Sequence, residues 1–336
     1  MKRRSVLLGA AATTVLGVAR AQAPQPRAYV MATATTGGTY YPVGVALATL
    51  AKIRLQAQHG VDMAAISSAG SGENIRLMRE NQAQFSILQG LFGEWARTGS
   101  GTLQADGPQP QLRSVMQLWP NVEHFVQRAD LAPTGTVADL ERIVGQGFAI
   151  GARNSGTEHS NRFLLRNLGH DPERFNLAFL GFNPAADALI NGNVAGTNLG
   201  AGPPVAAVTR VLAQMGNRAK LLELTDEQMK KADGGSGLYF RYVVKAGTYP
   251  GQDKDFQTTA QPNFLAVNAA VPEEDVYLFT KAVYENLPFL NNIHAATREM
   301  NIGNALAGLP LPLHPGAARY YREANQAIPD RLQPPR

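Results

Sequence analysis

Hydrophobic and polar positions along the first hundred residues form short apolar segments that alternate with amphipathic ones. The apolar segments predict strands at Tyr29–Ala34, Val61–Ser67 and Phe85–Leu88. The amphipathic segments predict helices at Val43–Ile53 and Glu73–Glu80. Strands that alternate with helices are typical of α/β folds with largely parallel sheets.

The same alternation returns in the middle of the chain. The predicted strands are Gly147–Gly151, Ala178–Phe182 and Gly196–Gly200. One helix is expected to open in the turn Asn154–Glu158, where Ser155 and Glu158 have capping-box spacing, and another to run from Asn183 to Leu189. Because a chain of this length exceeds what one core usually organises, the pattern favours two lobes.

The predicted lobes share the chain unequally. Residues 24–122 and about 236–336 are expected to form a discontinuous first lobe, and residues 123–235 a second one. The extended segments Leu112–Leu118 and His124–Gln127 would carry the chain across. The glycine-rich stretch Asp233–Gly237 could be the return connection or an exposed loop.

The first 23 residues have the pattern of a signal peptide. Lys2, Arg3 and Arg4 precede the apolar run Val6–Val18, and Ala21–Ala23 has the small-x-small form of a cleavage site. We therefore expect cleavage near Ala23 and export to the periplasm, by the twin-arginine or the Sec route. No cysteine is present to carry a lipid anchor or a disulfide.

Removal of that segment also removes most of the net charge. It holds four basic and no acidic residues, so the formal charge falls from +5 to +1. A nearly neutral chain gives no reason to expect a nucleic-acid partner. The six histidines lack the spacing of metal ligands, and no cofactor motif is present. We expect a monomer without a cofactor.

The turns between strands and helices carry the candidate chemistry. Thr35–Pro42 is a hydroxyl- and glycine-rich turn between a predicted strand and a predicted helix, and Asn154–Glu158 resembles it in the second lobe. Helix N-termini present unpaired backbone N–H groups and a partial positive charge. Since such turns border the ligand crevice in open α/β sheets, the sequence predicts an anion-binding pocket.

Seven motifs in chain order resemble the TAXI family of solute receptors, which serve tripartite ATP-independent periplasmic (TRAP) transporters. They cover nearly the whole mature chain. They are Thr36–Pro42, Ser71–Asn74, Gly151–Glu158, Leu180–Phe182, Ala185–Leu189, Tyr249–Gly251 and Leu313–Ala317.

The resemblance implies a type II periplasmic-binding-protein fold, with two α/β lobes, a hinge and a ligand cleft between them. It implies capture of a glutamate-like amino acid or a 2-oxo dicarboxylate by lobe closure, and delivery to a TRAP permease. The matching pocket residues are Thr36, Gly38, Thr39, Tyr40, Ser68, Ala69, Gln89, Asn154, Ser155, Gly156, Thr157 and Phe182.

Two positions depart from the pattern of that family. Arg153 precedes the Ser-Gly-Thr turn, and could clamp a second carboxylate or point to solvent. Trp119 could form the floor of the cleft or pack under the hinge as core.

Other functions remain compatible with such a fold. A receptor of an ABC or tripartite tricarboxylate importer, or a periplasmic sensor input, would use the same lobes. A periplasmic enzyme is the remote alternative, because the chain has no nucleophile elbow, zinc-binding helix motif or phosphate loop. We expect a binding protein rather than an enzyme.

Overall fold

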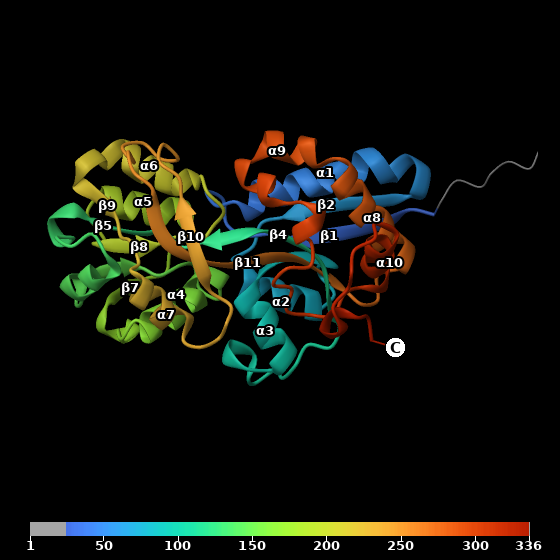
Figure 1. The fold of residues 1–336 in the computed structure, drawn as a ribbon, viewed down its shortest axis with the longest axis horizontal. Coiled ribbons are helices and arrows are strands. Elements are labelled where there is room, and N and C mark those ends of the chain that lie inside the picture. The colour runs from blue at the N-terminus through green and yellow to red at the C-terminus, as the bar shows by residue number, and fades with distance from the viewer. Residues whose placement is uncertain (1–24, 336) are drawn as a thin grey trace, which may run out of the picture.

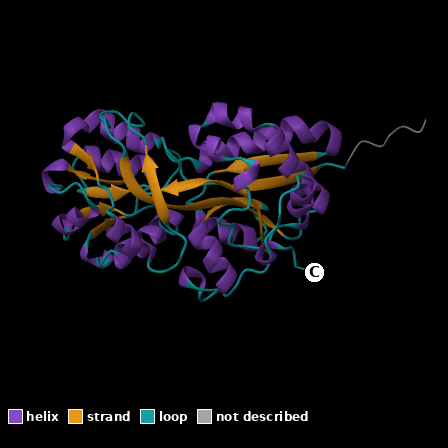
Figure 2. Ribbon diagram, viewed as in Figure 1, coloured by secondary structure: helices purple, strands orange, loops and turns teal. Residues whose placement is uncertain are grey.

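The computed structural model describes residues 25–335, and the predicted signal peptide lies outside this range. Figure 1 shows two α/β lobes side by side, each built around its own sheet. Figure 2 shows helices flanking the strands in both lobes. The predicted fold class is confirmed.

The first lobe contains a sheet in the order β10-β11-β3-β1-β2, with β4 also paired to β11. Strand β1 is parallel to β2 and β3, whereas β11 is antiparallel to β3, β4 and β10. Its strands are β1 Arg27–Ala32, β2 Val61–Ile66, β3 Phe85–Gln89, β4 Leu112–Val122, β10 Phe240–Val244 and β11 Phe256–Asn268. Its helices are α1 Tyr40–His59, α2 Ser71–Arg79, α3 Gly90–Thr98, α8 Glu273–Glu285, α9 Leu287–Ile293 and α10 Pro315–Glu323.

The second lobe contains a sheet in the order β7-β6-β8-β5-β9. Strand β6 is parallel to β7 and β8, and β5 is antiparallel to β8 and β9. Its strands are β5 Phe125–Arg128, β6 Gly147–Ala149, β7 Asn176–Ala178, β8 Gly196–Asn198 and β9 Ala219–Leu221. Its helices are α4 Gly156–Asn167, α5 Phe182–Ile190, α6 Ala206–Met215 and α7 Asp226–Asp233.

A long antiparallel ribbon, β4 with β11, joins the two lobes (Figure 1). Its pairing runs from Leu112 opposite Asn268 to Val122 opposite Ala260. At its far end Val122 exchanges two backbone hydrogen bonds with Ala201 of the second lobe, at 3.1 and 3.0 Å. Because β5 starts three residues later, the ribbon acts as the hinge that fixes how the lobes face each other.

The cores follow the two sheets, with one exception that bears on the lobe limits. Val244, Tyr249 and Phe256, from the β10–β11 hairpin, belong to the apolar cluster that includes helices α5 and α6. We propose that this hairpin moves with the second lobe, so that the chain returns to the first lobe near residue 256 rather than 236.

The predicted strand Ala178–Phe182 is wrong. Strand β7 ends at Ala178, because its three residues complete the pairing with β6. Gly181 is then the extended N-cap of α5, and Phe182 is already helical. An apolar run that closes a short edge strand and opens a buried helix looks continuous in sequence, which explains the error.

Phe264 at the centre of the hinge ribbon should be a strong stability determinant. Its side chain is fully buried, so Phe264→Ala is expected to lower the free energy of unfolding by about 3–5 kcal/mol. Urea denaturation measures this value. Phe240 lies in the same sheet but is 42% exposed, so Phe240→Ala is the matched control and should cost under about 1 kcal/mol. Equal losses in both variants would contradict a central role for the ribbon core.

Candidate functional site

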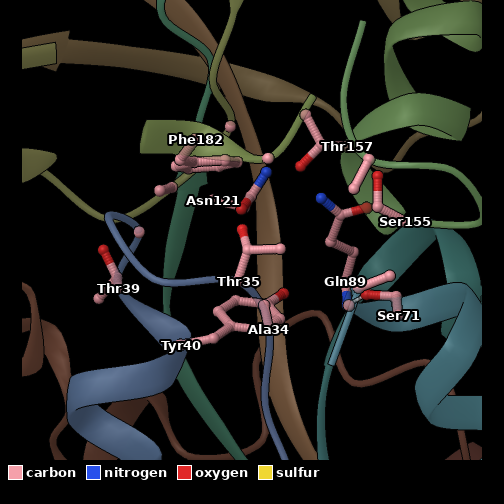
Figure 3. A pocket seen from close by; sticks show the side chains of 18 residues that line it. Ala34, Thr35, Thr39, Tyr40, Ser71, Gln89, Asn121, Ser155, Thr157 and Phe182 are labelled. Atoms are coloured by element: carbon pink, nitrogen blue, oxygen red, sulfur yellow. Dashed lines mark hydrogen bonds between the residues drawn. The ribbon is translucent and has the colours of Figure 1, made fainter. Parts of the chain in front are cut away.

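A cavity of about 430 Å³, partly open to solvent, lies between the two lobes (Figure 3). The first lobe contributes residues from the turns after β1, β2 and β3, and Asn121 from the end of β4. The second lobe contributes the turns around α4 and α5 and the segment after β8. The lining residues are Ala34, Thr35, Gly38, Thr39, Tyr40, Ala69, Gly70, Ser71, Gln89, Asn121, Ala152, Ser155, Gly156, Thr157, Gly181, Phe182, Gly200 and Ala201.

Five helices begin at this cavity. The N-cap residues of α1 to α5 are Thr39, Gly70, Gln89, Ser155 and Gly181, and all of them line it. Each of these helices has nine or more residues. Their first N–H groups have no intrahelical acceptor, and their dipoles place partial positive charge here. The cavity therefore favours an anion.

Side chains at two of these helix ends satisfy some of the backbone N–H groups there. Ser155 Oγ accepts from the Glu158 N–H at 2.9 Å, and Glu158 Oε2 accepts from the Asn154 N–H at 2.8 Å. On α2, Glu73 Oε2 accepts from the Ala69 N–H at 2.7 Å. The predicted cap of Ser155 is confirmed, while the Glu158 carboxylate reaches back one residue further than expected.

Gln89 presents its amide to the cavity. Its backbone N–H donates to Ser71 Oγ at 3.1 Å, and its side chain is almost fully buried. A Cβ atom placed on Gly156 would lie 2.7 Å from Gln89 Oε1, so this oxygen faces the start of α4. The amide nitrogen then points toward the middle of the cavity, as Figure 3 shows. Neither lysine nor arginine is among the lining residues.

A buried carboxylate lies directly behind the cavity wall. Glu123 accepts from Asn198 Nδ2 at 2.8 Å and from Asn121 Nδ2 at 3.3 Å, and it is fully buried. Asn198 also donates to Asn161 Oδ1 on α4 at 2.6 Å. Burial raises the pKa of Glu123 to about 7, against the lowering effect of the amide hydrogen bonds.

Sequence reasoning missed this carboxylate. Its signal was available, because Glu123 is the one acidic residue between Arg113 and Arg128 in a mostly apolar stretch.

Nine of the thirteen residues predicted from sequence line the cavity. They are Gly38, Thr39, Tyr40, Ala69, Gln89, Ser155, Gly156, Thr157 and Phe182. The lining residues that the sequence did not indicate include Thr35 and Ser71, each next to a predicted residue or motif, and Asn121 and Gly200, which the hinge brings in from distant segments.

Four predicted residues lie elsewhere. Thr36 and Asn154 are exposed. The Ser68 hydroxyl donates to Asn74 Oδ1 at 2.6 Å and so braces the turn before α2. Arg153 is exposed, with its guanidinium carbon 3.7 Å from the centre of the Phe179 ring.

Trp119 occupies the core position that the sequence left open. It is fully buried and packs edge-on against Tyr40, with the ring centres 6.2 Å apart. A Cβ on Gly202 would be 2.4 Å from its indole ring. Trp119 therefore supports the cavity wall from behind rather than lining it.

The lobes touch on both rims of the cavity. On one rim the Glu73 N–H donates to the Asn154 carbonyl at 3.2 Å. On the other, Thr39 Oγ1 donates to the Gly202 carbonyl at 2.7 Å, and the Ala207 N–H donates to the Gly37 carbonyl at 3.3 Å. These contacts close the cavity, because each joins one lobe to the other.

Residues 25–335 contain neither a helix suited to spanning a bilayer nor a group of side chains suited to a metal ion. The described helices include none with the length and apolarity to cross a bilayer. Histidine and acidic side chains in this range form no cluster suited to a metal ion.

This architecture is that of the periplasmic binding proteins. The model of the NMT1-like family matches residues 31–324, and the chain belongs to this family.

Solved structures agree on the fold. The periplasmic binding protein BugD aligns with a TM-score of 0.52 and 14% identity, over 90% of this chain and 94% of that one. A protein from Bordetella bronchiseptica RB50 gives 0.52 and 14%, over 90% and 85%. At these identities the likeness concerns the fold alone.

Gly72 should be a specific determinant of lobe closure. A Cβ at this position would lie 2.3 Å from the Asn154 carbonyl oxygen of the opposite lobe. Gly72→Ala should therefore cost the closed form about 1–3 kcal/mol and weaken ligand binding by about tenfold or more. Calorimetric titration measures the affinity, and the melting temperature of the free protein should change little.

Gly303→Ala is the matched control for that variant. Gly303 lies in the first lobe, and the nearest atom to an added Cβ is the side-chain oxygen of Asn301 at 3.2 Å. The affinity of the Gly303→Ala variant for the ligand should equal that of the unmodified protein. If Gly72→Ala also left the affinity unchanged, the contact with Asn154 would have no part in the bound form.

Glu123 should make stability depend on pH. Its pKa is about 7 in the folded protein against 4.5 for an unperturbed glutamate. The folded state thus binds the proton more tightly, so this contribution to stability is largest below pH 4.5 and is lost as pH rises through 7. Relative to Glu123→Gln, the unmodified protein should lose about 2–3 kcal/mol between pH 5 and pH 8 in urea unfolding.

Comparison with the glutamine variant cancels the opposing effect of buried His124. Burial lowers the pKa of His124 to about 4, so protonation in the unfolded state destabilises the fold as pH falls. The exposed Glu285 on α8 supplies a second control. The assignment to Glu123 fails if Glu285→Gln gives the same pH-dependent difference.

Proposed function

We propose that this protein is an exported solute-binding protein of the periplasm. It captures a small organic acid between its lobes and delivers it to a permease in the membrane. The observation that carries the proposal is the convergence of five helix N-termini on one cavity that no lysine or arginine lines. Such a site holds a carboxylate through backbone N–H groups, hydroxyls and the Gln89 amide.

Binding is coupled to closure because both lobes supply donors. An anion in the cavity meets the starts of α1 to α3 from one side and of α4 and α5 from the other. It therefore binds the closed arrangement more tightly than an open one and shifts the population toward it. The hinge ribbon lets the lobes separate without breaking either core, and the permease would recognise the closed outline.

The assignment to a kind of importer rests on the motif resemblance. The TAXI pattern favours a TRAP permease as the partner, and its ligands suggest glutamate-like amino acids and 2-oxo dicarboxylates. The nine predicted residues that line the cavity are proposed as ligand contacts, whereas Arg153 is not, because it stacks on Phe179 outside the cavity.

The test is a calorimetric titration of the mature protein, stripped of ligand by unfolding and refolding. The panel contains L-lactate, L-alanine, L-glutamate and 2-oxoglutarate, with the uncharged lactamide as a control. At least one carboxylate should bind and lactamide should not. If a folded protein bound none of the carboxylates, or bound lactamide as well as lactate, the proposed function would be wrong.

Gln89→Leu tests the site within the same assay. Loss of a hydrogen bond to a charged group costs about 1.5–3 kcal/mol, so the affinity for the bound carboxylate should fall by about tenfold or more. Arg153→Ala is the control outside the cavity and should leave the affinity unchanged. The reverse order of effects would move the anion site to the exposed mouth of the cleft.

A further inference from the structure

We infer that the ligand is a small monocarboxylate with a hydrogen-bond donor beside its carboxylate, such as a 2-hydroxy or 2-amino acid, whose donor group binds Asn121 Oδ1. This inference rests on the proposed function and narrows its ligand class. It also disfavours dicarboxylates, because a second carboxylate would be directed at the wall backed by Glu123.

The Glu123 carboxylate determines the orientation of the Asn121 amide. Asn121 is fully buried and lines the cavity, and its Nδ2 donates to Glu123 Oε1 at 3.3 Å. Turning the amide over would bring two oxygens together, so the Glu123 carboxylate holds Nδ2 on its own side. Asn121 Oδ1 remains buried with no partner among the described residues. A buried acceptor without a partner is costly, and a ligand donor would satisfy it.

Opposite walls of the cavity offer different chemistry. Gln89 and Ser71 lie on the side away from Asn121 in Figure 3. Gln89 directs its amide nitrogen into the cavity, while its oxygen, which also has no partner among the described residues, faces the start of α4; the Asn121 side supplies an acceptor. An anion placed at the helix ends would therefore have its neighbouring substituent facing Asn121. That substituent must donate a hydrogen bond.

The carboxylate of Glu123, behind the Asn121 wall, bears on whether the ligand carries one carboxylate or two. A Cβ on Gly200, which lines the cavity, would lie 2.8 Å from Glu123 Oε2. The carboxylate of Glu123 is thus only one small residue away from the ligand space. When Glu123 is ionised, its charge repels a second carboxylate and attracts an ammonium group. The cavity wall contains no cationic side chain to offset that repulsion.

The experiment compares ligands that differ in one group. L-lactate and L-alanine each carry a donor next to the carboxylate, and propionate is the same acid without it. Calorimetric titration of the mature protein should give lactate or alanine an affinity at least about tenfold above propionate. 2-Oxoglutarate should bind more weakly than the better of the two.

Two variants connect the preference to the proposed residues. Asn121→Leu removes the acceptor, so the ratio of the donor-bearing acid to propionate should fall toward one. Glu123→Gln keeps the shape but removes the charge and the constraint on the Asn121 amide. It should reduce the same ratio and raise the relative affinity for 2-oxoglutarate, which a general loss of structure would not do.

The outcomes separate this inference from the proposed function. If 2-oxoglutarate or L-glutamate bound more tightly than every monocarboxylate, or if propionate equalled lactate and alanine, the inference would be overturned while the organic-acid receptor remained. Binding of no carboxylate by the folded protein would overturn both. An unchanged ligand ratio in both variants would remove Asn121 and Glu123 from recognition.

Discussion

Helix ends that carry the same partial charge meet in a narrow gap between the two lobes. Helices α2 and α4 start so close together that a Cβ on Gly70 would lie 3.5 Å from the Gly156 nitrogen. Partial positive charges that converge in this way repel each other unless something negative lies between them. Glu73 and Glu158 offset part of the charge from outside. An anion in the cavity offsets the rest, and this links ligand charge to lobe closure.

The hinge allows these helix ends to move apart again. Helices cannot be pulled apart within one core without loss of packing, but here α1 to α3 and α4 to α5 belong to separate apolar clusters in two lobes joined by β4 and β11. The contacts between the rims include hydrogen bonds such as Thr39 to Gly202 and Glu73 to Asn154, and the Phe182 ring packs near Gly38. Water can replace such hydrogen bonds when the cleft opens. The energy for closure must therefore come largely from the ligand.

Local patterns allowed much of this arrangement to be predicted from sequence. The turns after β1 and β6 were found because hydroxyls and glycines between a strand and a helix have a local physical meaning, and Ser155 caps α4 as its spacing to Glu158 indicates. These turns held most of the predicted site residues. Short-range chain geometry was enough to find the turns, whereas the individual pocket residues were named from the motif resemblance.

Long-range pairing explains what the sequence did not reveal. Asn121 and Gly200 meet at the cavity only because β4 ends against the segment after β8. Trp119 packs behind Tyr40, which lies 79 positions earlier in the chain. A single sequence reveals neither contact, because contacts between residues so far apart in the chain produce no repeating pattern in it. The position of Arg153 depends similarly on a stacking partner, Phe179, in another loop.

Charge balance gives Glu123 a role beyond holding amides. A carboxylate behind one wall counteracts the field on that side only, because Asn121 and Asn198 both donate to it and so polarise that wall. The cavity then has a positive side for one acid group and an acceptor side for its neighbour. Selectivity for a ligand with both features follows from this asymmetry, since a purely anionic solute leaves the Asn121 oxygen without a partner.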